Sequence, residues 1–174
     1  MNWQVFTAIA AVTILCGCQG VQYNTPSGRP EVTIKAPAKD VKTVFVGTLT
    51  NLRYSLKKDS DFQIVMEKPI DNAMVNVLMS SQYDPTVEAR ITATFLEIGP
   101  ETRVTTELGV IRNGGSAFEA STDVSNSNDS RGVQALLQEI KAGLEGGQTV
   151  EQVTTTASQR SITDRAKAAM KPAQ

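Results

Sequence analysis

The feature of this sequence that most constrains its fold is a regular alternation over residues 87–112. Apolar and polar side chains take turns along residues 87–95, and the alternation resumes after a turn signal at Gly99-Pro100-Glu101. Successive side chains of a strand point to opposite faces of a sheet. We therefore predict a long hairpin within an antiparallel sheet that has one apolar and one solvated face. The positions predicted on the core face are Val87, Ala89, Ile91, Ala93, Phe95, Val104, Thr106, Leu108 and Val110.

Two segments have apolar residues at the spacing of helices that cover such a sheet. One spans residues 38–52 and follows Pro37, and the other spans residues 133–144, with cap candidates before it and Gly146-Gly147 after it. Each pattern recurs every three or four residues, which places the apolar side chains on one helix face. These side chains are Val41, Val44, Phe45, Leu49 and Leu52 in the first helix, and Val133, Leu136, Leu137, Ile140 and Leu144 in the second.

Shorter alternating runs at residues 31–35, 54–58 and 62–68 predict further strands, the last with Phe62, Ile64 and Met66 on one side. Residues 71–82 favour a short helix, although a strand stays open. Together the elements predict an α+β fold, an antiparallel sheet with two main helices packed on one face. In element order this two-layer sandwich resembles the helix-grip modules of lipoproteins in the outer-membrane β-barrel assembly machinery.

The N-terminus carries an uncharged apolar run that ends at Leu15. It is shorter than the roughly 20 residues that a membrane-spanning helix needs, and its length is typical of a signal peptide. The run ends in Leu15-Cys16-Gly17-Cys18, which resembles the lipobox of bacterial lipoproteins. The resemblance implies cleavage between Gly17 and Cys18, a diacylglycerol thioether on Cys18 and usually an acylated amine. Cys16 fits less well because Leu15 would then precede the cleavage site. A buried N-terminal helix and an ordinary cleaved leader are the alternatives.

The predicted domain organisation follows from these signals. Residues 1–17 are the signal peptide, 18–30 a lipidated N-terminus and flexible tether, 31–147 the α+β domain, and 148–174 a polar tail that is disordered or loosely helical. Gln19 replaces the Asp that favours retention in the inner membrane of sorted lipoproteins. The resemblance therefore implies the periplasmic face of the outer membrane, with the periplasmic face of the inner membrane as the alternative.

Composition excludes several classes of function. The chain has no histidine, and its two cysteines are Cys16 and Cys18. Catalytic triads that use histidine and ordinary zinc sites are therefore excluded. The net charge of −1 argues against a nucleic-acid partner, which requires a concentrated basic surface. Trp3, the one tryptophan, lies in the predicted leader. We predict that the protein is not an enzyme and needs no cofactor or metal.

Several local patterns suggest chemistry but have simpler structural interpretations. Ser55 and Lys58 match a Ser-x-x-Lys motif without its partner motifs, and the glycines at 143–147 are better explained as a helix stop. The remaining candidates are carboxylates on a solvated sheet face or in loops without calcium-loop spacing, and basic residues of a solvated tail. They are Glu88, Glu97, Glu107, Asp123 and Asp129, and Arg160, Arg165, Lys167 and Lys171.

Three functional hypotheses remain. The first is a membrane-anchored, non-catalytic interaction or assembly module of the cell envelope, with an envelope protein as its partner and an exposed apolar patch as its signature. The second is a carrier of a small apolar ligand, held between helix and sheet. The third is a hydrolase that uses serine, lysine and carboxylates, which requires a cleft where such groups converge. The residues predicted to line the carrier's pocket are Phe45, Phe62, Phe95 and Leu137.

Overall fold

The predicted hairpin forms the centre of the sheet. In the computed structural model, which describes residues 20–70 and 87–171, β4 (Val87–Ile98) and β5 (Glu101–Arg112) pair antiparallel along their full length. Thr94 faces Thr105 and Phe95 faces Val104 in this register. Gly99, at the turn, has a φ of 60°, a left-handed conformation that glycine adopts without steric cost. The register matches the alternation of the sequence, and seven of the nine predicted core-face residues are buried. Ala89 and Val110 are half-buried, and Ile111 on the opposite face is buried.

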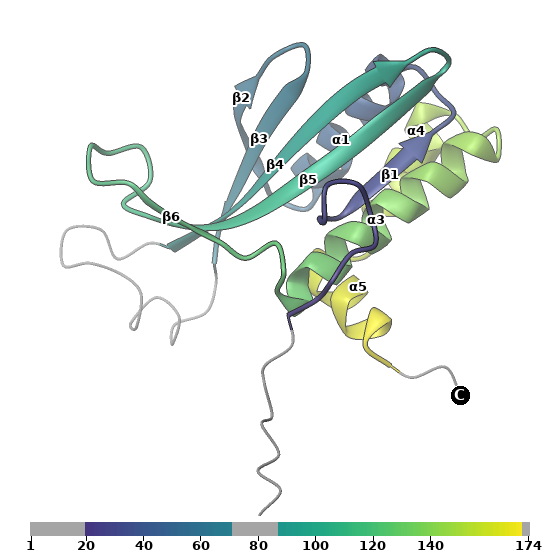
Figure 1. The fold of residues 1–174 in the computed structure, drawn as a ribbon. Coiled ribbons are helices and arrows are strands. Elements are labelled where there is room, and N and C mark those ends of the chain that lie inside the picture. The colour runs from purple at the N-terminus through teal and green to yellow at the C-terminus, as the bar shows by residue number, and fades with distance from the viewer. Residues whose placement is uncertain (1–19, 71–86, 172–174) are drawn as a thin grey trace, which may run out of the picture.

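The sheet contains six antiparallel strands, in the order β1-β5-β4-β3-β2 with β6 also paired to β5 (Figure 1). β1 (Glu31–Ile34) and β6 (Ala120–Asp123) share one edge of β5, with β1 along residues 102–105 and β6 along residues 109–112. β3 (Gln63–Pro69) pairs with β4, and β2 (Ser55–Asp59) is the exposed strand at the far edge. The sequence patterns predicted all of these strands except the short, polar β6.

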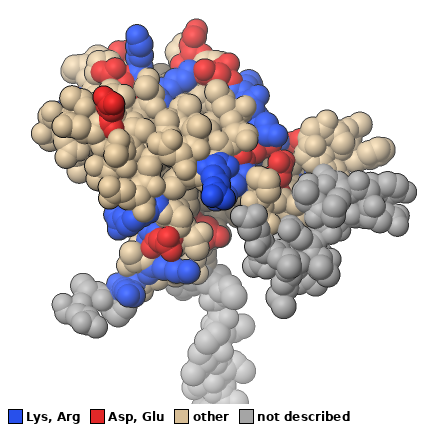
Figure 2. All heavy atoms as spheres, turned by 180° about the vertical axis from the view of Figure 1, so that it is seen from behind, with Lys and Arg blue, Asp and Glu red and all other residues tan. Residues whose placement is uncertain are grey.

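The two predicted core helices are α1 (Ala38–Asn51) and α3 (Asn128–Glu145). Their apolar faces share one core with the sheet, and Phe45 of α1 meets Phe95 of β4 edge to face with ring centroids 6.0 Å apart. Figure 1 shows the helices gathered on one side of the sheet. Figure 2, seen from that side, shows acidic and basic side chains interspersed over the surface. The α+β class and the antiparallel sheet are as predicted.

For the tail beyond residue 147, disorder is wrong in the described part, and the helical alternative is right except that the helices are packed into the domain. The described part of the tail forms α4 (Val150–Ala157) and α5 (Ile162–Ala169). Small and medium apolar residues on one side of these helices join the core, among them Val153, Ala157 and Ile162. The domain therefore continues past the predicted boundary, because a few well-spaced small residues are enough when a neighbouring helix offers a matching face.

Local capping explains where the two C-terminal helices begin. The Thr149 hydroxyl accepts from the Gln152 amide while the Gln152 side chain accepts from the Thr149 amide, which is a complete capping box. The Ser161 hydroxyl accepts from the Asp164 amide at the start of α5. Both caps satisfy backbone donors that a helix start otherwise leaves unpaired. The helix predicted at 71–82 lies outside the described residues.

Candidate functional site

The first described residues pack against the domain. The Val21 amide donates to the Asn126 carbonyl at 2.8 Å, and the hydroxyls of Tyr23 and Ser130 lie 2.6 Å apart. Val21 is 9% exposed. The prediction of a flexible tether over 18–30 is therefore wrong for residues 20–30. The turn-forming residues that suggested flexibility instead fold the segment back onto the domain, with Gly28 at a φ of 66°.

The end of this segment is fixed to the sheet as well. Both the amide and the hydroxyl of Thr106 donate to the Pro30 carbonyl, at 2.9 and 3.1 Å. This explains how a threonine occupies a fully buried position on the core face, because a buried hydroxyl needs a partner. Arg29 forms ion pairs with Glu107 and Asp123 on the neighbouring strands. Hydrogen bonds from Ser125, followed by the nearby guanidinium of Arg29, lower the pKa of the Asp123 carboxyl.

Cys18 and Gly17, the predicted lipidation and cleavage residues, lie outside the described residues. Gly20, two positions after Cys18, is the first residue of the docked segment. The anchor prediction itself is therefore untested by the fold. The first hydrogen bond to the domain, from Val21 to Asn126, comes three residues after Cys18.

The predicted ligand pocket between helix and sheet is occupied by side chains. Phe45, Phe95 and Leu137 are 0 to 1% exposed and belong to one packed core. Phe62 is 66% exposed, so its assignment to the core face was wrong. It precedes β3 and belongs to the turn after β2, where the alternation that buries Ile64 and Met66 has not begun.

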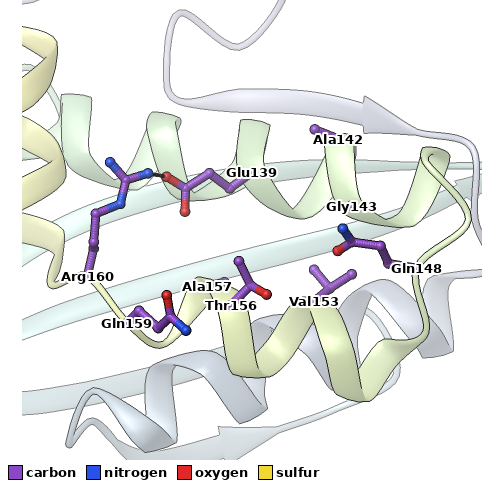
Figure 3. Close-up of a pocket in the computed structure, with 9 residues that line it drawn as sticks. All are labelled: Glu139, Ala142, Gly143, Gln148, Val153, Thr156, Ala157, Gln159 and Arg160. Atoms are coloured by element: carbon purple, nitrogen blue, oxygen red, sulfur yellow. Dashed lines mark hydrogen bonds and ion pairs between the residues drawn. The ribbon is translucent and has the colours of Figure 1, made fainter.

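An open groove lies between α3 and α4 and holds about 360 Å³ (Figure 3). Ala142, Gly143, Val153 and Ala157 supply small side chains along it. Glu139, the acidic group of the groove, is paired with Arg160 and with Arg165. Both oxygens of this carboxylate are therefore engaged in ion pairs within the groove.

Arg165 is the most deeply buried charged side chain among the described residues. Its guanidinium donates to Glu139 of α3 at 2.6 and 3.0 Å, and to the carbonyl oxygens of Ala157 and Arg160. It therefore ties together α3, the end of α4 and α5. The interpretation as a solvated tail residue is wrong for Arg165, whereas Arg160, Lys167 and Lys171 are exposed, and Arg160 is also paired with Glu139. No sequence signal distinguished the buried Arg165 from the exposed basic residues, because its burial depends on pairing with Glu139, which lies on another helix.

A second hollow, of about 340 Å³, opens between the sheet and α5. Tyr54, Lys68 and Asp129 lie on its wall, and the Lys68 ammonium stands 5.7 Å from the Tyr54 ring centroid. Burial, with a smaller contribution from the charge of Asp129, raises the pKa of Tyr54 to about 12. The phenol is therefore protonated at neutral pH and acts as a hydrogen-bond donor.

The other sequence candidates remain separate. Ser55 and Lys58 lie in strand β2, so they lack the one-turn helical spacing that the serine-lysine motif uses. Glu97 and Glu107 are exposed, and Glu107 is paired with Arg29. Within residues 20–70 and 87–171, no group of three acidic or cysteine side chains is arranged to hold a metal ion.

Three exposed apolar side chains lie toward one end of the sheet, while Leu56, Phe118 and Met170 are exposed elsewhere among the described residues. Phe62, Leu96 and Ile98 are 66, 47 and 54% exposed. Leu96 and Ile98 end β4 at the hairpin turn, on the face of the strand opposite to Phe95. The Phe95 amide donates to the Phe62 carbonyl, so the Phe62 backbone lies next to Phe95 at the same end of the sheet. We name these three residues the apolar tip. Figure 1 shows this hairpin end opposite the end at which the described chain begins.

No protein-family model and no curated protein sequence matches this chain. None of the described helices is both long enough and apolar enough to cross a bilayer. Three features of the structure bear on function: the docked N-terminal segment, the filled core and the exposed apolar tip.

Proposed function

We propose that this chain is a lipid-anchored envelope lipoprotein that acts as a non-catalytic interaction module and binds a protein partner through its apolar tip. The observation that carries the proposal is the exposure of Phe62, Leu96 and Ile98 at the end of the sheet remote from the docked N-terminal segment. Large apolar side chains that gather on a surface are typical of interaction sites. The lipobox residues Leu15-Cys16-Gly17-Cys18 support the anchor, and Gln19 supports the outer membrane over the inner one.

The other two hypotheses have less support. A ligand carrier needs space at Phe45, Phe95 and Leu137, and these side chains pack closely in the core. A hydrolase needs converging serine, lysine and carboxylate groups, whereas Ser55 and Lys58 lie in an exposed edge strand.

The anchor is tested by fatty-acid labelling and intact mass of three chains. The wild type and the matched control Cys16→Ala are expected to carry lipid, since alanine preserves a small residue before Gly17. Cys18→Ala is expected to lose the label and retain the leader. Lipid on Cys18→Ala, or no lipid on the wild type, contradicts the anchor. Membrane fractionation of the labelled chains then distinguishes the outer from the inner membrane.

The apolar tip is tested by photo-crosslinking in the envelope. A photoreactive residue at Ile98 is compared with one at Thr155, an exposed position on α4. We expect a discrete protein adduct from position 98 that disappears when Leu96→Asp is added, and no such adduct from position 155. Equal adducts from both positions, or an adduct unaffected by Leu96→Asp, would reject the apolar tip as the binding surface.

A further inference from the structure

The distance between the predicted lipid and the folded domain is very short. Val21, the first residue hydrogen-bonded to the domain, is the third residue after Cys18, and three extended residues span at most about 10 Å. Val21 is then hydrogen-bonded to Asn126 just before α3 begins. A lipid on Cys18 therefore leaves no room for a flexible spacer, and the end of the domain around Val21 has to lie at the membrane surface.

That end of the molecule also carries the last turn of α5. Tyr23 bonds Ser130 in the first turn of α3, and an ideal Cβ on Gly132 would stand 2.0 Å from the Ile162 carbonyl, so α3 and α5 touch at their beginnings. Figure 1 shows α5 running on toward the same end as the point where the described chain begins. The segment that follows Ile162 therefore faces the bilayer side.

The exposed residues of this turn suit a headgroup layer. Lys167 lies in the last turn of α5, and Met170 and Lys171 follow the end of the helix; Met170 is 46% exposed, and both lysines are exposed as well. Figure 2 shows basic side chains at this lower end beside acidic ones. Asp164, the carboxylate on α5, bonds the hydroxyl of Ser161 at the helix start. A methionine flanked by lysines matches an interface with an apolar interior and anionic headgroups.

We infer that the domain stands directly on the membrane, with Lys167, Met170 and Lys171 in an anionic lipid headgroup layer and the apolar tip held away from it. This inference rests on the proposed lipidation of Cys18. It adds an orientation that lipidation alone does not require, since a lipidated chain with a free spacer would present all its faces to the bilayer.

Tryptophan quenching tests the orientation cleanly, because removal of the leader removes Trp3 and leaves a chain without tryptophan. Met170→Trp is compared with the matched control Leu96→Trp, since these side chains are 46 and 47% exposed. Each full lipoprotein is placed in vesicles of phosphatidylethanolamine and phosphatidylglycerol that contain a lipid with a nitroxide on its headgroup. We expect quenching several-fold stronger at position 170 than at position 96. Circular dichroism verifies that both variants are folded.

A spacer variant gives the second arm. Ten Gly and Ser residues inserted between Gln19 and Gly20 add a flexible reach of roughly 18 Å, and quenching at position 170 should fall toward that at position 96. Vesicle flotation distinguishes failure of the lipid anchor from failure of the proposed orientation. A chain that does not float with vesicles overturns the lipid anchor and the orientation together. A chain that floats but is quenched equally at both positions overturns the orientation alone.

Discussion

The contact between α3 and α5 makes Gly132 the position where one added methyl group should do most damage. An ideal Cβ at this position would lie 2.0 Å from the Ile162 carbonyl oxygen and 2.9 Å from its carbonyl carbon. Because the obstacle is backbone, no rotamer change relieves it. In Gly132→Ala the two helices must separate by more than an ångström, or α5 must shift along α3.

The magnitude follows from two opposing effects. Overpacking a tight interior site costs about 1 to 3 kcal/mol, and a clash with backbone belongs at the upper end of that range. Replacing glycine by alanine within a helix stabilises the helix by up to about 1 kcal/mol, which offsets part of this cost. We therefore expect the free energy of unfolding to fall by about 2 kcal/mol, which for a chain of 174 residues lowers Tm by about 4 to 8 °C.

Urea unfolding followed by far-ultraviolet circular dichroism measures this change in the leaderless chain. Gln138→Ala, on the exposed face of the same helix, is the control and should alter the free energy of unfolding by less than about 0.5 kcal/mol. If Gly132→Ala is as stable as the wild type, the close approach of α5 to α3 is refuted, and with it the placement of the last turn of α5.

Three further predictions concern charged and phenolic groups. Glu139→Gln should lower the free energy of unfolding by about 3 kcal/mol, because it leaves the buried Arg165 guanidinium without its carboxylate. Urea unfolding measures this change, and an unchanged free energy of unfolding would contradict the prediction. Burial raises the pKa of Tyr54 to about 12 from an ordinary value of 10.0, so stability should decline as the pH rises from 10 toward 12. Tyr54→Phe should remove the phenol that ionises at the highest pH in an ultraviolet titration. Burial raises the pKa of the Glu31 carboxyl, but hydrogen bonds, chiefly from Arg103, outweigh burial, and the net pKa is lowered. The resulting stabilisation is present above the ordinary value of 4.5 and is lost as the pH falls below it, so Glu31→Gln should flatten the acid side of the pH–stability curve.

The sheet and the two core helices could be predicted because their signals are periodic and local. The alternation from Val87 to Phe95 requires one buried face in any tertiary context, and a one-residue slip would move every core side chain into water. The apolar stripe of residues 133–144 is equally independent of its surroundings. The resulting hairpin and helices agree with those patterns to within a few residues.

The C-terminal helices could not be predicted in the same way, because their burial depends on partners that are remote in sequence. Ala157 buries little area, and Val153 and Ile162 join the core where α3 presents glycines to them, Gly143 to Val153 and Gly132 to Ile162. Arg165 has the composition of a surface residue and is buried by Glu139 and two carbonyl groups. A pattern of hydrophobicity along one segment does not contain this information.

The docked N-terminal segment escaped prediction for a related reason. Its attachment uses backbone groups, the Val21 amide and the Pro30 carbonyl, together with the Tyr23 hydroxyl. Turn-rich composition predicts a local bend and does not reveal whether the bent chain finds hydrogen-bond partners elsewhere. The one trace in the sequence was Thr106, a polar residue in a row of core positions, which is buried because it bonds Pro30.

A docked segment changes what a lipid anchor does for the proposed module. β4 has 12 residues, which at about 3.3 Å per residue carries the apolar tip roughly 40 Å from the start of the strand. A free tether would let the tip sample a wide volume, with a low effective concentration at any one height above the membrane. A domain that stands on the bilayer instead holds Phe62, Leu96 and Ile98 within a narrow range of heights. Such a module selects partners that present their own binding surface at that height. A spacer between Gln19 and Gly20 should therefore weaken partner crosslinking at position 98, even though it leaves the apolar tip itself unchanged.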